Sequence, residues 1–411
     1  MNKRIILVIS LLALAITFVF IYKKGSTTTK ITPNSYVGFF NARSIDNPKN
    51  YYIGYATSSD SINWTSASNP ILKPRPKMFD SQMLNGPCPV KVGNNIYVYY
   101  SGYNGKKWTT GLTIFDLNMN ILYRSKSPIL DVGESGSWDS SNIFRVSVSY
   151  NEKAEDPNKK FAMLYGGSSK EIYKIGLAYS SDGIKWSKYE NNPVLSNGAP
   201  GEWDSNWASQ PTFTLVDDTY YLAYNGYDGN QITGGLATSQ SLEGPWVKSG
   251  SNPVLKNRPN ATQLLTKDVE PGETTIEISN ADVFDLNEPC YLQCSNGTEL
   301  VRVKSKIDSN TIELYEPTIL SHYTDNNAKI ESLFCKSEGP NQIVYENGKW
   351  KAYCTVFANS LGFESTAIAE GNDLNSLQWN FNNTPIMDFN PIISSKWDSL
   401  SQENLRFIKI N

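Results

Sequence analysis

The chain has 411 residues, of which 39% are hydrophobic and 12% aromatic, enough to bury a sizeable core. Its formal net charge is only −3, so a nucleic-acid partner is not expected. It holds a single histidine, His322, which lies outside the repeats described below. Mechanisms that need a Ser-His-Asp triad or several histidines around a metal are therefore excluded from those repeats.

The first 24 residues are typical of a targeting segment. Asn2-Lys3-Arg4 precede an uncharged apolar run from Ile5 to Tyr22, which Lys23-Lys24 close. Its 18 residues are at the short end of a membrane span, and no small-x-small cleavage site follows. We expect an uncleaved N-terminal transmembrane helix (a signal-anchor) over 1–24, a linker over 25–34 and an extracytoplasmic domain beyond. If the segment is cleaved instead, the protein is secreted.

A sequence pattern recurs along the rest of the chain at intervals of roughly 60 residues. Its clearest copy is Ile175–Leu195, IGLAYSSDGIKWSKYENNPVL. Alternating apolar residues predict a strand, the Ser-Asp-Gly run predicts a turn, and the Trp begins another strand that Asn-Pro ends. Tyrosine-rich strands such as Tyr220–Gly229 precede the copies, so each unit has about four short strands. The other copies are Ile53–Leu72, Gly111–Leu130, Gly235–Leu255 and Ala367–Met387.

Such units cannot bury their apolar faces alone, and radial stacking into a β-propeller solves this. The C-terminal segment Ser401–Asn411 reads as a first strand without partners, and the N-terminal unit lacks its first strand. Pairing the two removes an open edge. We therefore predict an all-β, five-bladed propeller closed by its N- and C-terminal strands.

The repeat is interrupted between residues 257 and 333. This segment has its own strand pattern, split by PGE, NGT and DSN turns, and predicts a small inserted β module. Blades one to four then occupy residues 35–256, and blade five with the closing strand occupies 334–411. The module either extends a binding face or acts as a spacer.

The five cysteines do not decide the redox compartment. Cys335 and Cys354 flank one predicted hairpin, and a disulfide between them is one alternative. Cys290 and Cys294, with no histidine beside them, are too few for a zinc site. We expect no metal site and no cofactor.

Candidate catalytic residues lie where the innermost strands of the blades begin, around the central channel. Counting back from the shared tyrosines predicts one residue of each blade at the mouth of this channel. Glu338 and Glu403 place carboxylates there and form a candidate acid/base pair. The alternative is ion pairing with Arg145, Arg406 or Lys336. The five predicted positions are Asn85, Ser141, Ser209, Glu338 and Glu403.

An aromatic-Asp-Ser motif recurs just upstream, as Phe79-Asp80-Ser81, Trp138-Asp139-Ser140, Trp203-Asp204-Ser205 and Trp397-Asp398-Ser399. Because it repeats, each Asp is first read as a turn cap and each aromatic as a packing residue. Asp80 and Asp204 remain candidates for a catalytic carboxylate, and Trp138 and Trp203 for sugar binding.

The pattern IGxAxSxDGxxWxxxxxNPVL, with its Trp-Asp-Ser motif, resembles the five-bladed propeller glycosidases of families 32, 43, 68, 117 and 130. The resemblance covers residues 35–411 except the insert. Ser337-Glu338-Gly339-Pro340 is similar to the Glu-Gly-Pro of family 43, which implies that Glu338 is the general acid. The Asp-Pro that holds the base of family 43 has no counterpart, since Gly86-Pro87 and Gln210-Pro211 stand there. Glu403, Asp80 or Asp204 would supply the second carboxylate.

The resemblance implies a glycoside hydrolase that acts on an extracellular or cell-surface glycan through paired carboxylates. The alternative is a non-catalytic carbohydrate-binding or surface-assembly propeller that kept the fold and lost the base. Phosphorolysis ranks lower, because no basic cluster for phosphate is evident at the starts of the inner strands.

Overall fold

The computed structural model describes residues 31, 33, 35–44, 47–255, 257–258, 261–295, 297–358, 364–383 and 401–410. The predicted membrane segment 1–24 and the Trp397-Asp398-Ser399 motif lie outside them. Within these ranges we find no helix that is long and apolar enough to cross a membrane. The helical elements here are 3-10 turns of three residues: η1 (Pro157–Lys159), η2 (Ala281–Val283), η3 (Thr324–Asn326), η4 (Leu374–Ser376) and η5 (Phe381–Asn383).

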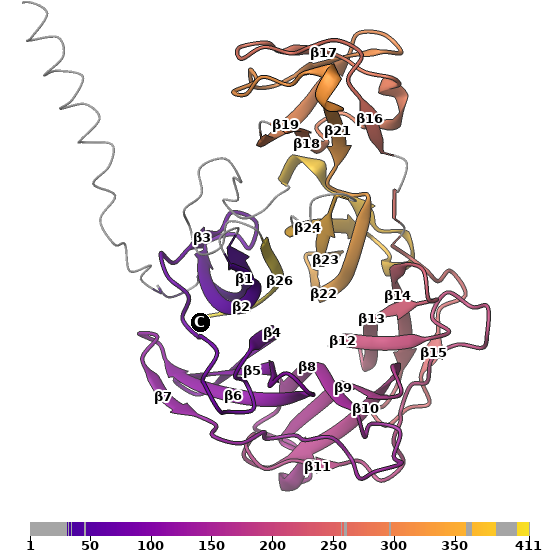
Figure 1. Cartoon of the computed structure of the whole chain (residues 1–411). Coiled ribbons are helices and arrows are strands. Elements are labelled where there is room, and N and C mark those ends of the chain that lie inside the picture. The colour runs from indigo at the N-terminus through magenta and orange to yellow at the C-terminus, as the bar shows by residue number, and fades with distance from the viewer. Residues whose placement is uncertain are drawn as a thin grey trace, which may run out of the picture.

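Antiparallel strands form successive blades around a central axis, as Figure 1 shows. The predicted all-β propeller architecture is therefore confirmed. The first of three consecutive blades consists of β4 (Met83–Val92), β5 (Asn95–Tyr103), β6 (Trp108–Asp116) and β7 (Ile121–Arg124). The second consists of β8 (Asn142–Tyr150), β9 (Phe161–Ser169), β10 (Ile172–Ser180) and β11 (Ser187–Lys188). The third consists of β12 (Trp207–Val216), β13 (Thr219–Tyr227), β14 (Ile232–Ser239) and β15 (Val247–Lys248). A further blade is β22 (Lys336–Glu346), β23 (Lys349–Phe357), β24 (Glu364–Gly371) and β25 (Gln378–Trp379).

Another blade joins the two ends of the described chain. Its innermost strand is β26 (Ser401–Lys409), followed by β1 (Tyr36–Ser44), β2 (Asn47–Ser58) and β3 (Thr65–Ser66). β26 pairs antiparallel with β1, for example Val37 with Ile408. The predicted pairing of the terminal strands is thus confirmed. The inner strands contact one another in the order β4, β8, β12, β22, β26, and β26 contacts β4.

The repeated sequence pattern has a structural counterpart in each of several blades. The leucine that ends a copy forms an isolated bridge to the blade's third strand, as in Ile53–Leu72 and Ile175–Leu195. The Asn of Asn-Pro bonds the same strand, since Leu177 N donates to Asn192 Oδ1 at 2.8 Å. The indole N–H of Trp186 donates to Gly183 O in the preceding turn. These contacts fold the tail of each copy back onto its own blade.

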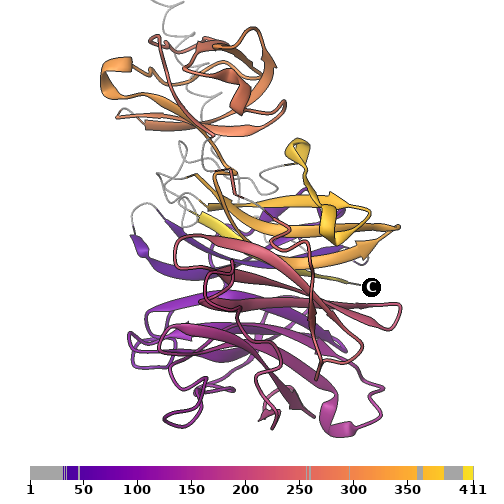
Figure 2. The same ribbon diagram turned by 90° about the vertical axis from the view of Figure 1, so that its right-hand side faces the viewer.

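The segment between β15 and β22 forms a separate sheet with its own apolar core, as the upper parts of Figures 1 and 2 show. Phe334, Trp379 and Phe381 join it to the blade that follows, with ring centroids of Phe334 at 4.8 and 5.0 Å from the other two. Its strands, in sheet order, are β16 (Thr262–Leu264), β21 (Lys329–Ser332), β18 (Pro289–Cys294), β19 (Gly297–Lys306), β20 (Thr311–Leu314) and β17 (Thr275–Glu277).

All five cysteines are free thiols, so the suggested Cys335–Cys354 disulfide is wrong. The physical reason is that the two side chains belong to different cores. Cys335 packs in the core of the inserted module, whereas Cys354 packs between the blades that begin with β12 and β22.

Candidate functional site

Each inner strand carries a β-bulge near its start. At the bulge the inner strand has at least one more residue than the stretch of the neighbouring strand that it pairs with. One residue in each bulge adopts a positive φ, which re-aims the neighbouring side chains. These residues are Gly86, Arg145, Gln210, Gly339 and Asn404, with φ of 57°, 47°, 54°, 137° and 57°. The residues just before them form the ring that the sequence predicted, with one exception.

The exception is in β8, where Phe144 rather than Ser141 occupies the ring position. Phe144 pairs with Gly166 immediately before the bulge at Arg145. Ser141 lies ahead of the strand, and its N–H donates to Ser168 O at 2.8 Å. The prediction for Ser141 was wrong because β8 has no proline at the bulge to mark the register. Asn85, Ser209, Glu338 and Glu403 stand at the ring as expected.

Glu338 of β22 forms an ion pair with Arg145 of β8, with 3.1 Å between Glu338 Oε2 and Arg145 Nη1. This pairing is the one expected as the alternative to a catalytic role. The Glu338 side chain is 20% exposed, so it is partly accessible to solvent. Burial raises the pKa of Glu338 and the charge of Glu403 adds to the rise, while Arg145 opposes it.

Arg145 connects several blades at the mouth of the channel. Its Nε donates to Asn85 Oδ1 at 2.9 Å, and its Nη1 also donates to Gln210 Oε1. Gln210 in turn accepts from Asn225 Nδ2 at 2.7 Å. The predicted site residue Asn85 therefore positions an arginine. The Ser209 hydroxyl is buried and has no hydrogen-bond partner among the described residues.

A third carboxylate, Glu364, joins the two that the sequence predicted. Glu364 begins β24 and lies beside Ser401, two residues before Glu403 in β26. Burial raises the pKa of Glu364 well above its usual range, and the charge of Glu403 and a hydrogen bond between the two carboxyl groups raise it further. Glu403 itself is buried and accepts from Asn404 Nδ2 at 2.9 Å.

Arg43 and Tyr51 complete this side of the site. Arg43 Nη2 donates to Glu364 Oε1 at 2.8 Å, and its guanidinium lies 5.0 Å from the centre of the Tyr51 ring. The pKa of the Tyr51 phenol is raised, first by burial and then by Glu403 and Glu364. The mouth of the channel thus combines three carboxyl groups with two guanidinium groups.

Glu364, Arg43 and Tyr51 were not singled out from the sequence. The sequence did hold a signal for Glu364, which is the first residue of the third strand of its blade. In three other blades this position is occupied by an apolar or aromatic residue, Trp108, Ile172 or Ile232. A carboxylate at that position departs from the repeat, as Glu338 and Glu403 do at theirs. Arg43 and Tyr51 belong to β1 and β2, whose link to the site depends on closure of the ring.

Asp80 and Asp204 form ion pairs inside their own blades. Asp80 is fully buried, pairs with Arg75 and Arg124 at 2.8 Å each, and accepts from the Tyr100 hydroxyl. Asp204 accepts from the Tyr224 hydroxyl at 3.1 Å and pairs with Lys248 at 2.7 Å. The repeated Asp therefore joins the second strand of its blade to the outermost one, which favours the structural interpretation.

Trp138 and Trp203, predicted to bind sugar, pack on glycines of their own blades. A Cβ atom added to Gly176 would lie 2.8 Å from the Trp138 ring, and one added to Gly235 would lie 2.2 Å from that of Trp203. Their rings lie against Tyr165 and Tyr224 at 5.8 and 5.5 Å.

His322 is buried in the inserted module, where its Nε2 lies 2.7 Å from Glu299 Oε1. Among the described residues we find no group of three or more His, Cys, Asp or Glu side chains that could hold a metal ion.

The chain is similar to enzymes that act on oligosaccharides. The family model described as beta-1,4-mannooligosaccharide phosphorylase matches residues 134–271. Over 120 residues the chain is 30% identical to a beta-1,2-mannobiose phosphorylase of Thermoanaerobacter sp. (strain X514), a match that covers 26% of this chain and 36% of that relative. The chain therefore spans only about a third of the length of this relative.

Two solved structures are similar to this chain to different degrees. A glycosyl hydrolase from Bacteroides ovatus superimposes with a TM-score of 0.50 at 14% identity, over 85% of this chain and 84% of that one. An exo-1,5-alpha-L-arabinanase from a bovine ruminal metagenomic library has a TM-score of 0.48 at 13% identity, over 85% and 94%. The expected resemblance to the propeller glycosidases is confirmed. The carboxylates Glu338, Glu364 and Glu403 lie outside the matched residues 134–271, so their role must be argued from geometry.

Proposed function

We propose that this protein hydrolyses a glycosidic bond of an oligosaccharide or glycan at the mouth of its propeller channel. The observation that carries the proposal is the convergence of Glu338, Glu364 and Glu403, from three different strands, on one end of the inner strands. We further propose that the blades form a closed five-bladed ring. Residues 1–24 would anchor it in a membrane with the propeller on the extracytoplasmic side.

The surroundings of the three carboxyl groups suggest that they have different catalytic roles. Glu338 is partly exposed and its pKa is raised, which suits a proton donor to the leaving glycosidic oxygen. Glu364 lies beside Glu403, and burial together with the charge of Glu403 raises the pKa of Glu364 well above its usual range. That pair can accept a proton from water or stabilise positive charge on the sugar, as the second carboxylate of a glycosidase does.

Phosphorolysis is the second candidate, because the matched family model and relative are phosphorylases and two arginines stand at the site. A phosphate dianion needs cationic charge that is not already neutralised. Arg145 is engaged by Glu338, Asn85 and Gln210, and Arg43 by Glu364. Because both guanidinium groups of the site already have carboxyl or amide partners, we rank water above phosphate as the acceptor.

The test is turnover by the full chain on a panel of oligosaccharides that begins with manno-oligosaccharides, with and without inorganic phosphate. Free reducing sugar formed without phosphate supports hydrolysis, whereas strictly phosphate-dependent sugar 1-phosphate supports phosphorolysis. Glu338→Gln should lower kcat at least about 10²-fold, a usual size for general acid–base catalysis. Glu346→Gln, at the far end of β22, is the matched control and should keep wild-type turnover.

Turnover that survives Glu338→Gln would remove this residue from the mechanism. Saturable glycan binding by wild type and variant, without turnover in either, would instead support the non-catalytic binding propeller.

A further inference from the structure

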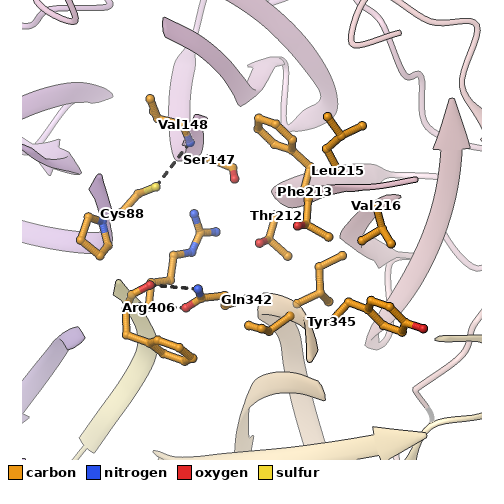
Figure 3. A pocket seen from close by; sticks show the side chains of 15 residues that line it. Cys88, Ser147, Val148, Thr212, Phe213, Leu215, Val216, Gln342, Tyr345 and Arg406 are labelled. Carbon is orange, nitrogen blue, oxygen red and sulfur yellow. Dashed lines mark hydrogen bonds between the residues drawn. The ribbon is translucent and has the colours of Figure 1, made fainter. Parts of the chain in front are cut away.

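A polar cavity lies among the inner strands, on the far side of the bulges from the candidate active site. It has a volume of about 290 Å³ and is lined from all five inner strands. Figure 3 shows its side chains, among them Cys88, Ser147, Thr212, Gln342 and Arg406. Each lies after the bulge of its strand, whereas Glu338 and Glu403 lie before it. The cavity is therefore separate from the candidate active site.

Arg406 of β26 reaches into this cavity. Its Nη1 donates to Val146 O of β8 at 2.5 Å, and its Nη2 donates to Pro211 O of β12 at 2.9 Å. The residue is only 5% exposed. Within the part of the chain that the structure describes, no Asp or Glu carboxylate forms an ion pair with it. Arg145, the other arginine on the axis, is paired with Glu338.

A buried guanidinium without a counter-charge is unfavourable, since backbone carbonyl dipoles replace only part of its hydration. Burial accordingly lowers the pKa of Arg406, the neighbouring Cys88 side chain partly opposes this, and the positive charge of Arg145 lowers the pKa further. An anion that entered the cavity would remove this penalty.

The lining supplies further donors for such an anion. In Figure 3 the side chains of Ser147 and Thr212 line the cavity beside the guanidinium, from two different strands. The Gln342 amide is already fixed, because it donates to Phe407 O at 3.0 Å and accepts from Phe407 N at 2.8 Å. The Cys88 sulfur accepts from Val148 N at 3.4 Å. The two hydroxyls and the guanidinium are therefore the groups left to meet a ligand.

We propose that this cavity is a binding site for a small oxyanion, a phosphate, sulfate or carboxylate group, held by Arg406 together with Ser147 and Thr212. Guanidinium and hydroxyl donors on three sides match the several acceptor oxygens of such groups. The anion would join the closing strand β26 to β8 and β12 across the axis and would stabilise the closed ring. This site does not depend on the proposed hydrolase activity.

The test follows the thermal unfolding midpoint of the full chain at constant ionic strength, while sodium chloride is replaced by phosphate, sulfate or formate. A ligand that binds only the folded state should raise the midpoint saturably, on the order of 2 °C at high occupancy. Arg406→Gln should abolish the rise and Thr212→Val should weaken it. Arg124→Gln, which removes an ion pair with Asp80, should keep it.

If Arg406→Gln does not fold, wild-type crystals soaked in selenate give the answer. An anomalous peak beside the Arg406 guanidinium is the expected result. The proposal is overturned if the midpoint responds alike in wild type and Arg406→Gln, or if no selenate peak lies in the cavity. An equal rise of the unfolding midpoint on addition of sodium chloride alone would also contradict a site for an oxyanion.

Discussion

Three carboxyl groups and two guanidinium groups share the mouth of the channel, and their protonation controls what the site can do. Glu364 is the clearest case, because burial and the neighbouring Glu403 raise its pKa well above the usual range, although Arg43 opposes the rise. A carboxyl group whose pKa is raised on folding binds its proton more tightly in the folded state. Its contribution to stability is present below the unfolded pKa and is lost as pH rises through the folded one.

Glu364→Gln should therefore flatten the dependence of stability on pH. Wild type loses stability as pH rises above about 4.5, the ordinary value for Glu, by at most ~1.4 kcal/mol per pH unit for one proton. The amide cannot ionise, so the variant should lose less between pH 5 and 8. Urea unfolding at several pH values measures this, with Glu346→Gln as the control. Equal slopes in wild type and Glu364→Gln would contradict a raised pKa of Glu364 in the folded state.

Asp204→Asn should separate a structural carboxylate from a catalytic one. The change weakens the pair with Lys248 and the bond from the Tyr224 hydroxyl. Because the lysine side chain is 29% exposed, we expect a loss of about 1–3 kcal/mol of stability, less than for a fully buried pair. The kcat of the folded variant should stay near wild type. A 100-fold loss of kcat at unchanged stability would restore Asp204 as a catalytic candidate.

The site residues that could be predicted from the sequence are those that depart from the repeated pattern. Glu338 and Glu403 were predictable, because each is an acid at a position where other blades have Ser, Asn or Phe. Their neighbour Glu364 was not, since its approach to Glu403 arises from contact between β24 and β26. Chain order alone does not show which strand starts meet across a blade boundary.

Within one blade, the aromatic-Asp-Ser motif acts as a packing element. The Trp203 ring occupies the space above two glycines of adjacent strands, Gly226 and Gly235, where added Cβ atoms would lie 2.1 and 2.2 Å from ring atoms. The motif and the glycines of the next strands thus depend on each other. This explains why the motif recurs without any need for catalysis.

Gly235→Ala should destabilise the blade by about 1–3 kcal/mol, the usual cost of overpacking a well-filled core. The matched control is Gly250→Ala, whose added Cβ would meet no heavy atom within 4 Å. Urea unfolding of both variants measures the difference. Equal stabilities would show that the Trp203 ring can move aside at little cost.

The β-bulges show where the register of an inner strand could be predicted from the sequence and where it could not. Pro87, Pro211 and Pro340 stand next to positive-φ residues in three inner strands, so their spacing fixed the register there. In β8 a positive φ at Arg145 occurs without a proline, and the predicted ring residue was three positions too early. A bulge is a backbone feature that many sequences can adopt.

For the whole molecule, the pairing of β26 with β1, which closes this blade, determines whether the site exists. Glu403 and Asn404 come from β26, and Arg43 and Tyr51 come from β1 and β2, so the two ends of the described chain must pair to bring them to Glu338. The unpaired N-terminal unit made this closure predictable. The inserted module contributes none of the contacts described at the site.

Phe407→Ala tests closure directly. Phe407 is 6% exposed, and its ring centroid lies 5.6, 5.3 and 4.8 Å from those of Tyr36, Trp64 and Tyr353. Truncation should cost about 3–5 kcal/mol, as for other buried phenylalanines. Because β26 then holds β1 less firmly, limited proteolysis should cut first within β1, β2 or β26. Phe213→Ala, a half-buried residue of β12, is the control and should cost less. If both variants lose equal stability and are cut at the same places, the terminal strands are not the point at which the ring opens, and the site does not depend on their pairing alone.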